Sequence, residues 1–178
     1  MIKKLLLAIS LAVIMAATAQ AASLRVEGAP ASVTPSTIFV VEFIVEDIVI
    51  ADSMNGYMTF DPLMVDGIGV EIGSWFDQAT GAFEFKIIDV DTPGVVSFIY
   101  SDFGATYTGS GTAAKVTFHC EGPGLAVIDY HFELASAGPN VIDEVGVIEV
   151  DQVIPEPMTL ALIGGALAAL GAVARKRS

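Results

Sequence analysis

Carboxylates are the most abundant side chains in this sequence that could do chemistry. Residues 22–154 contain 20 Asp and Glu residues and three basic residues, Arg25, Lys86 and Lys115, which gives a net charge of −17. A glycosidase needs two carboxylates about 5 to 10 Å apart. However, none of the acids lies in a recognisable catalytic motif, and so many acids form chance pairs. We therefore expect a solvated acidic surface and no enzymatic activity, and the charge argues against nucleic acid or anionic lipid as a partner.

The two histidines, His119 and His131, are the other candidates for catalysis or metal binding. A three-residue hairpin loop between Cys120 and Leu125 would place His119 opposite Leu125 or Val127. His131 would then lie about 13 to 20 Å further along the hairpin. On that geometry the two imidazoles cannot share a metal ion.

Asp89 and Asp91 leave weak calcium binding as an open alternative. They lie two positions apart beside the turn sequence Thr92-Pro93-Gly94, so their carboxylates could point the same way. Extracellular modules commonly bind calcium weakly through such acids and loop carbonyls. Two solvated acids at a strand end would give the same pattern. The sequence therefore assigns no catalytic, cofactor-binding or metal-binding residue.

Cys120 is the single cysteine of the chain, so no internal disulfide can form. It follows Ala114, Val116 and Phe118 in strict alternation with polar residues. This pattern is typical of a small buried core residue, and no neighbouring base or positive charge suggests a nucleophile. We expect Cys120 to be inert and the domain to be stabilised by its core alone.

The elements that must position these side chains are β-strands. Apolar and polar residues alternate with a period of two along the body of the chain, and clusters of Gly, Pro, Asp and Asn separate the alternating segments. The pattern predicts an all-β fold, an antiparallel β-sandwich in one domain of residues 22–152. The nine expected strands are 23–27, 38–46, 55–60, 66–72, 82–89, 95–100, 113–120, 125–134 and 144–151.

Five segments carry a resemblance to a known family; they are VEFIV (41–45), GYMTFDPLMV (56–65), GVVSFIY (94–100), GTAAKVTF (111–118) and GPG (122–124). Asp61 is expected to cap its turn through the side chain, while Pro62 fixes φ and ends the strand. In this order the segments resemble the cohesin domain, which implies a nine-stranded jelly-roll sandwich. The agreement is weakest at the N-terminal strand and at the long acidic connection 46–52.

The resemblance implies an interaction module. Cohesins bind dockerin modules through one face of the sandwich and so tether enzymes to scaffolds, mostly for polysaccharide breakdown. The chain has no dockerin-type calcium loops, so a dockerin-like partner would be another chain. The alternative is a polysaccharide-binding module of the extracellular matrix, which would expose aromatic residues. The aromatics in expected loops are Trp75, Phe76 and Tyr107, although Trp75 and Phe76 could equally anchor a loop in the core.

The N-terminus has the features of a secretory signal. Two lysines precede an apolar segment at residues 5–17, and Ala19-Gln20-Ala21 has the small-x-small pattern of a cleavage site. We expect residues 1–21 to form a helical signal peptide that is cleaved after residue 21, with Ala19 and Ala21 as the small residues of the cleavage site, and the body to leave the cytoplasm. An uncleaved membrane anchor is the alternative, but the apolar segment is short for a span.

The C-terminal residues 153–178 combine three features. Pro155-Glu156-Pro157 precedes an uncharged segment, 158–174, and Arg175, Lys176 and Arg177 follow it. As a helix, the segment would be about 25 Å long, a marginal transmembrane span, with the basic cluster on the cytoplasmic side. An ordinary membrane anchor would also fit these features.

The tail also resembles the PEP-CTERM sorting signal of Gram-negative bacteria. This resemblance implies that exosortase reads the tripeptide Pro155-Glu156-Pro157 and removes the tail, often in bacteria that make exopolysaccharide. We therefore expect a non-enzymatic module that is exported through the inner membrane to the cell envelope, outer surface or extracellular matrix. Its C-terminal helix would lie in the membrane before processing.

Overall fold

The computed structural model describes residues 21–79, 81–136 and 141–154. Most of the predicted signal peptide, including Ala19, lies outside these residues. So do the sorting motif Pro155-Glu156-Pro157, the segment 158–174 and the basic cluster 175–177. Among the described residues, no helix is long and apolar enough to cross a membrane.

The described part of the chain forms ten strands and one short 3-10 helix. The strands are β1 (Ser23–Glu27), β2 (Ser32–Val33), β3 (Ile38–Ala51), β4 (Ser53–Phe60), β5 (Val65–Ile72), β6 (Phe83–Asp89), β7 (Val95–Phe103), β8 (Tyr107–Cys120), β9 (Gly124–Ala135) and β10 (Ile142–Gln152). The helix, η1 (Ser74–Gln78), connects β5 to β6. Each of the nine predicted strands corresponds to one of these ten.

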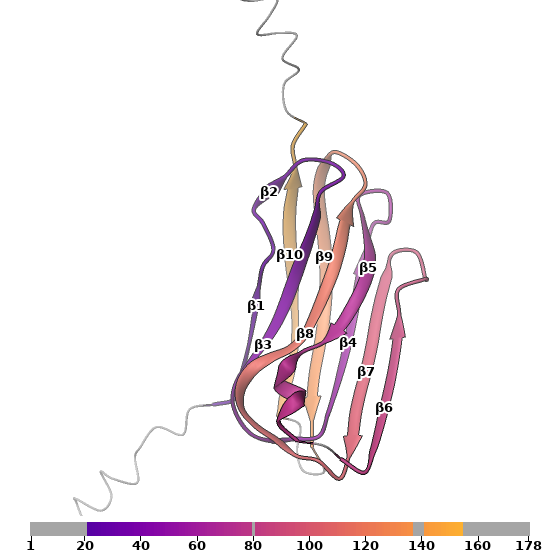
Figure 1. Ribbon diagram of the computed structural model, residues 1–178. Coiled ribbons are helices and arrows are strands. Elements are labelled where there is room, and N and C mark those ends of the chain that lie inside the picture. Colours follow the sequence, from indigo (N-terminus) through magenta and orange to yellow (C-terminus); the bar gives the residue numbers. More distant parts are fainter. Residues whose placement is uncertain (1–20, 80, 137–140, 155–178) are drawn as a thin grey trace, which may run out of the picture.

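Two sheets form the layers of a sandwich (Figure 1). The smaller sheet has the order β1-β3-β8-β5, and the larger has the order β2-β10-β9-β4-β7-β6. Neighbouring strands are antiparallel, except that β2 pairs with β10 in parallel. The all-β sandwich is therefore confirmed, and the short strand β2, which the sequence analysis missed, is added to it.

Alternating apolar residues from both sheets meet in the core. In β3 the residues from Phe39 to Val45 alternate between buried and partly exposed, as a strand with one covered face requires. Phe43 of the smaller sheet stacks on Phe132 of the larger, with ring centroids 5.3 Å apart, and its ring lies 6.5 Å from that of Phe98. This aromatic contact joins the two layers at the centre of the sandwich.

The connection after β8 differs from the expected hairpin. β8 pairs with β3 and β5 in the smaller sheet, whereas β9 pairs with β10 and β4 in the larger one. Residues 121–123 therefore cross from one sheet to the other. The predicted pairing of His119 with Leu125 or Val127 is wrong, and His119 lies opposite Ile38 of β3 instead.

β3 and β8 are longer than the sequence predicted. The segment 46–52, expected to be an acidic connection, continues β3 to Ala51. β8 begins at Tyr107, whereas the sequence predicted a strand beginning at residue 113 because Gly109-Ser110-Gly111 is typical of a turn. The pairing of these two strands shifts register in three places, and Asp47 has a positive φ of 55°. Bulges interrupt the alternation of side chains, which made these parts of the strands resemble loops.

The turn after β4 has the predicted structure. The backbone N–H of Leu63 donates to Oδ1 of Asp61 at 2.9 Å, and the N–H of Met64 donates to the carbonyl of Asp61 at 2.9 Å. Asp61 therefore caps the turn through its side chain, and β4 ends at Phe60.

Candidate functional site

The outer face of β6 and β7 carries a group of exposed apolar side chains. They are 39 to 62% exposed, and the strand register places Phe83 opposite Phe103 and Ile87 opposite Ile99, with Phe85 between these rows. The rings of Phe83 and Phe103 have centroids 6.2 Å apart. We call Phe83, Phe85, Ile87, Ile99 and Phe103 the apolar patch. Contiguous exposed apolar surface of this kind is typical of a binding site.

The register with β7 explains why β6 turns its apolar residues outward. Phe98 and Tyr100 of β7 are buried in the core, and they pair with Ile88 and Lys86 of β6. Residues on either side of these point the opposite way. Phe85 and Ile87 therefore face solvent, although the alternation of β6 by itself predicts that its more apolar side is the core side. The sequence pattern of β6 therefore gives no indication of the apolar patch.

A shallow hollow of about 450 Å³ lies across β4, β9 and β10 on the same outer face. Tyr57, which is 47% exposed, lines it with Thr59 of the same strand. The other lining residues are Asp129, Tyr130 and His131 of β9 and Val145, Gly146 and Val147 of β10. The hollow combines an exposed aromatic ring with polar groups. On such a surface the aromatic ring can stack against a ring of a bound ligand, and the polar groups can hydrogen-bond to the same ligand.

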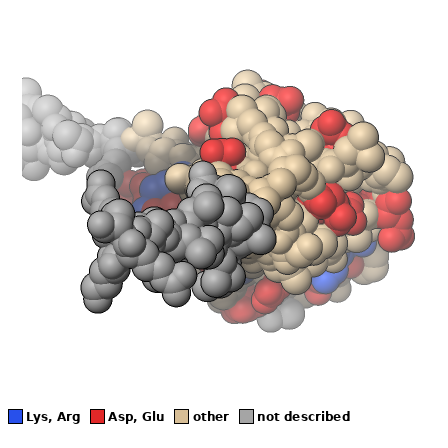
Figure 2. Space-filling model, turned by 90° about the horizontal axis from the view of Figure 1, so that it is seen from above, with Lys and Arg blue, Asp and Glu red and all other residues tan. Residues whose placement is uncertain are grey.

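The acidic residues are dispersed. Figure 2 views the sandwich from the end at which β10 finishes, and red carboxylates are scattered over the visible surface with little blue between them. Surface ion pairs join Lys115 to Glu42 at 3.0 Å and Arg25 to Glu46 at 3.2 Å, and Arg25 also pairs with Glu27. Most carboxylates therefore have no basic neighbour to balance them, since the body carries three basic residues against 20 acidic ones.

The carboxylate of Asp89, part of the open calcium alternative, caps the turn that follows β6. Its Oδ1 accepts the backbone N–H of Asp91 at 3.0 Å and that of Thr92 at 3.3 Å, and its Oδ2 accepts the Thr92 hydroxyl at 2.9 Å. The bond from the Thr92 hydroxyl, followed by that from the Asp91 N–H, lowers the pKa of Asp89. The arrangement of Asp89 is explained by the turn itself.

The other residues singled out in the sequence are not brought together into one site. Trp75, Phe76 and Tyr107 are buried, with exposures of 3% or less, so these aromatics are unavailable to a polysaccharide. Cys120 is also buried, and burial raises the pKa of its thiol. His119 and His131 lie on opposite outer faces, where they contact Glu121 at 2.6 Å and Asp143 at 2.8 Å.

Comparisons with known proteins place this fold. No protein-family profile matches the sequence, and no curated protein matches it. Among solved structures, a type II cohesin domain from the cellulosome of Acetivibrio cellulolyticus is 12% identical with a TM-score of 0.62, over 73% of this chain and 95% of that one. The sixth cohesin of scaffoldin B from Acetivibrio cellulolyticus, solved in complex with a dockerin, is 15% identical with a TM-score of 0.57, over 75% and 100% of the two chains.

A third similar structure comes from outside cellulosomes. It is the non-cellulosomal cohesin of the archaeon Archaeoglobus fulgidus, which is 13% identical with a TM-score of 0.55, over 79% of this chain and 96% of that one. At these identities the likeness concerns the fold. The described residues thus have the cohesin-like fold that the resemblance of the five sequence segments implied.

Proposed function

We propose that this chain is an exported protein-binding module that docks a dockerin-like partner on the apolar patch. The observation that carries the proposal is the row of exposed aromatic and aliphatic side chains on β6 and β7. A cohesin of the same fold has been solved in complex with a dockerin, which supports a protein partner. The module acts by binding and carries out no reaction of its own.

Physical chemistry favours this patch as the centre of an interface. Phe83 and Phe103 are more than half exposed, and burying large aromatic rings supplies much of the binding free energy at protein interfaces. Asp89 continues the outward-facing residues of the same edge strand, and it can contribute a charged group to the polar rim of the contact.

A binding experiment with matched variants tests the proposal. The purified protein is used to capture partners from the native envelope, and captured proteins are identified and inspected for dockerin-type calcium loops. We expect the parent to retain such a protein and F85S/I87S to lose it. A calcium chelator should release the captured protein from the parent. The control is I38S on β3, which removes an exposed apolar side chain from the smaller sheet. Retention by F85S/I87S, or equal loss by I38S, would contradict docking on the apolar patch.

A polysaccharide-binding module is the second candidate function. Its support is the exposed ring of Tyr57 in the hollow, beside Asp129 and His131. If this candidate is right, the parent protein binds a glycan on an array, Tyr57→Ala abolishes that binding, and F85S/I87S does not affect it. The two candidates are therefore distinguished by the variant that abolishes binding. F85S/I87S should abolish binding of a protein partner, whereas Tyr57→Ala should abolish binding of a glycan.

Delivery to the envelope is the remaining part of the proposal. The signal features of residues 1–21 would direct export, and exosortase would recognise Pro155-Glu156-Pro157 and remove the tail that follows. The segment 158–174 would hold the chain in the inner membrane until then.

A further inference from the structure

We propose that the outer face of β9 and β10 carries a binding site for one divalent transition-metal cation, with His131, Glu133 and Asp143 as its protein ligands. This inference is independent of the proposed function, because it depends on three side chains and their charges and not on a partner. The sequence indicates no metal site here, because Asp143 is distant from His131 and Glu133 along the chain. The three residues come together only through the pairing of β9 with β10.

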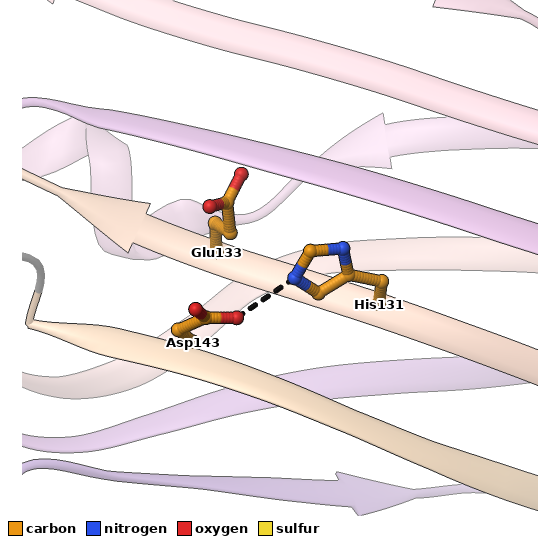
Figure 3. A group of neighbouring side chains, drawn as sticks. All are labelled: His131, Glu133 and Asp143. Carbon is orange, nitrogen blue, oxygen red and sulfur yellow. Dashed lines mark hydrogen bonds and ion pairs between the residues drawn. The ribbon is translucent and has the colours of Figure 1, made fainter.

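The strand register places the three side chains side by side (Figure 3). His131 and Glu133 are two residues apart on β9 and so share a face, and Asp143 of β10 lies directly opposite Glu133. One ligand atom from each residue lies within 4.8 Å of the other two, and His131 Nε2 is 2.8 Å from Asp143 Oδ1. Zinc with nitrogen and oxygen ligands at about 2.0 to 2.2 Å needs ligand atoms about 3.4 Å apart.

Small side-chain rotations bring the group to that spacing. The side chains of His131 and Asp143 are 42% and 59% exposed, so neither is fixed by core packing. Glu133 is held in place by Asn55 of β4, whose Nδ2 donates to Oε2 at 3.1 Å. This bond orients the carboxylate and leaves Oε1 free of that contact, which is the role of residues that support metal ligands.

The charges around the group favour a cation. Glu133 and Asp143 are like charges directly opposite each other on paired strands, an arrangement that destabilises a sheet. Asp129 adds a third carboxylate nearby on the face of β9. β4, β9 and β10 contain no Lys or Arg in their described residues. A bound divalent cation would remove the repulsion between the two opposed carboxylates.

The ligand types select the class of metal. An imidazole nitrogen with two carboxylates suits zinc and its first-row neighbours, whereas calcium and magnesium prefer oxygen ligands alone. Three protein ligands leave at least one coordination position open, and the exposed side chains direct it toward solvent. The site is therefore of the open type that keeps a water or an external ligand.

A titration with Zn²⁺ tests the inference. Calorimetry is done on the full chain with excess Ca²⁺ and Mg²⁺ present, so that unselective binding to the many carboxylates is suppressed. We expect one Zn²⁺ per chain, with affinity weakened about tenfold or more in His131→Ala and in Asp143→Asn. The control is His119→Ala, which removes the other histidine and its contact with Glu121 and should leave binding unchanged.

Two further measurements distinguish loss of metal binding from loss of folding and identify the histidine that binds the metal. Thermal unfolding without metal shows whether each variant is folded, and Zn²⁺ should raise the melting temperature of the parent and of His119→Ala but not of His131→Ala. NMR of the parent should show the ring nitrogens of His131 shifting with one equivalent of Zn²⁺ while those of His119 do not. Absence of Zn²⁺ binding, binding that His131→Ala leaves intact, or unchanged His131 resonances would overturn the proposal.

Discussion

At the scale of single residues, the buried carboxylate of Asp102 on β7 connects the start of β8 to the segment between η1 and β6 through hydrogen bonds. Asp102 is 4% exposed and accepts the Tyr107 hydroxyl at 2.6 Å and the Gly81 backbone N–H at 2.9 Å. Burial, followed by the bond to Asp102, raises the pKa of Tyr107, so the phenol remains a hydrogen-bond donor. The sequence could not predict this pair, because an Asp near a strand end is ordinarily solvated.

Tyr107→Phe is expected to destabilise the protein by about 1 to 3 kcal/mol, because it removes one of the donors to a buried carboxylate. The ring would still pack against Trp75 and Phe76, so little packing is lost. The free energy of unfolding from urea denaturation measures the effect. Tyr57→Phe, at an exposed ring, is the control and should change stability by less than about 0.5 kcal/mol. Equal stability of the parent and Tyr107→Phe would contradict a structural role for the pair.

At the scale of elements, the sequence predicted the strands well because alternation reports which residues face the core. It could not predict how the strands are shared between two sheets, so the crossing from β8 to β9 was mistaken for a hairpin. β2, with two residues, is too short to show a period. The candidate sites depend on register: the apolar patch requires the pairing of β6 with β7, and the metal ligands require that of β9 with β10.

Packing of the Phe98 ring over Gly56, its partner on the neighbouring strand β4, gives a prediction at this glycine. A Cβ added there would lie 2.1 Å from Cζ of Phe98, whose ring fills the core beside Phe43 and Phe132. Gly56→Ala is therefore expected to cost about 1 to 3 kcal/mol of the free energy of unfolding. Gly69→Ala on β5 is the matched control, since the nearest atom to its added Cβ is 4.0 Å away. Comparable urea midpoints for the two variants would show that the Phe98 ring does not pack over Gly56.

At the scale of the whole molecule, the proposed function gives different tasks to the body and to its two ends. The body is stabilised by one apolar core without a disulfide, and residues 22–154 carry a net charge of −17. All core residues of the described part of the chain precede Pro155, so removal of the proposed tail would leave this core intact.

The final prediction concerns that tail. Replacing Pro155, Glu156 and Pro157 with alanines should leave export intact but retain the full-length chain in the membrane. The reason is that the signal features of residues 1–21 would direct export, whereas the tripeptide and not the apolar segment 158–174 would be read by exosortase. Fractionation with immunoblotting measures the size and location of both forms. The control is I38S, which changes the body alone and should be processed like the parent. Normal processing of the alanine variant would mean that the tripeptide is not the recognition signal, and the tail would then be an ordinary membrane anchor.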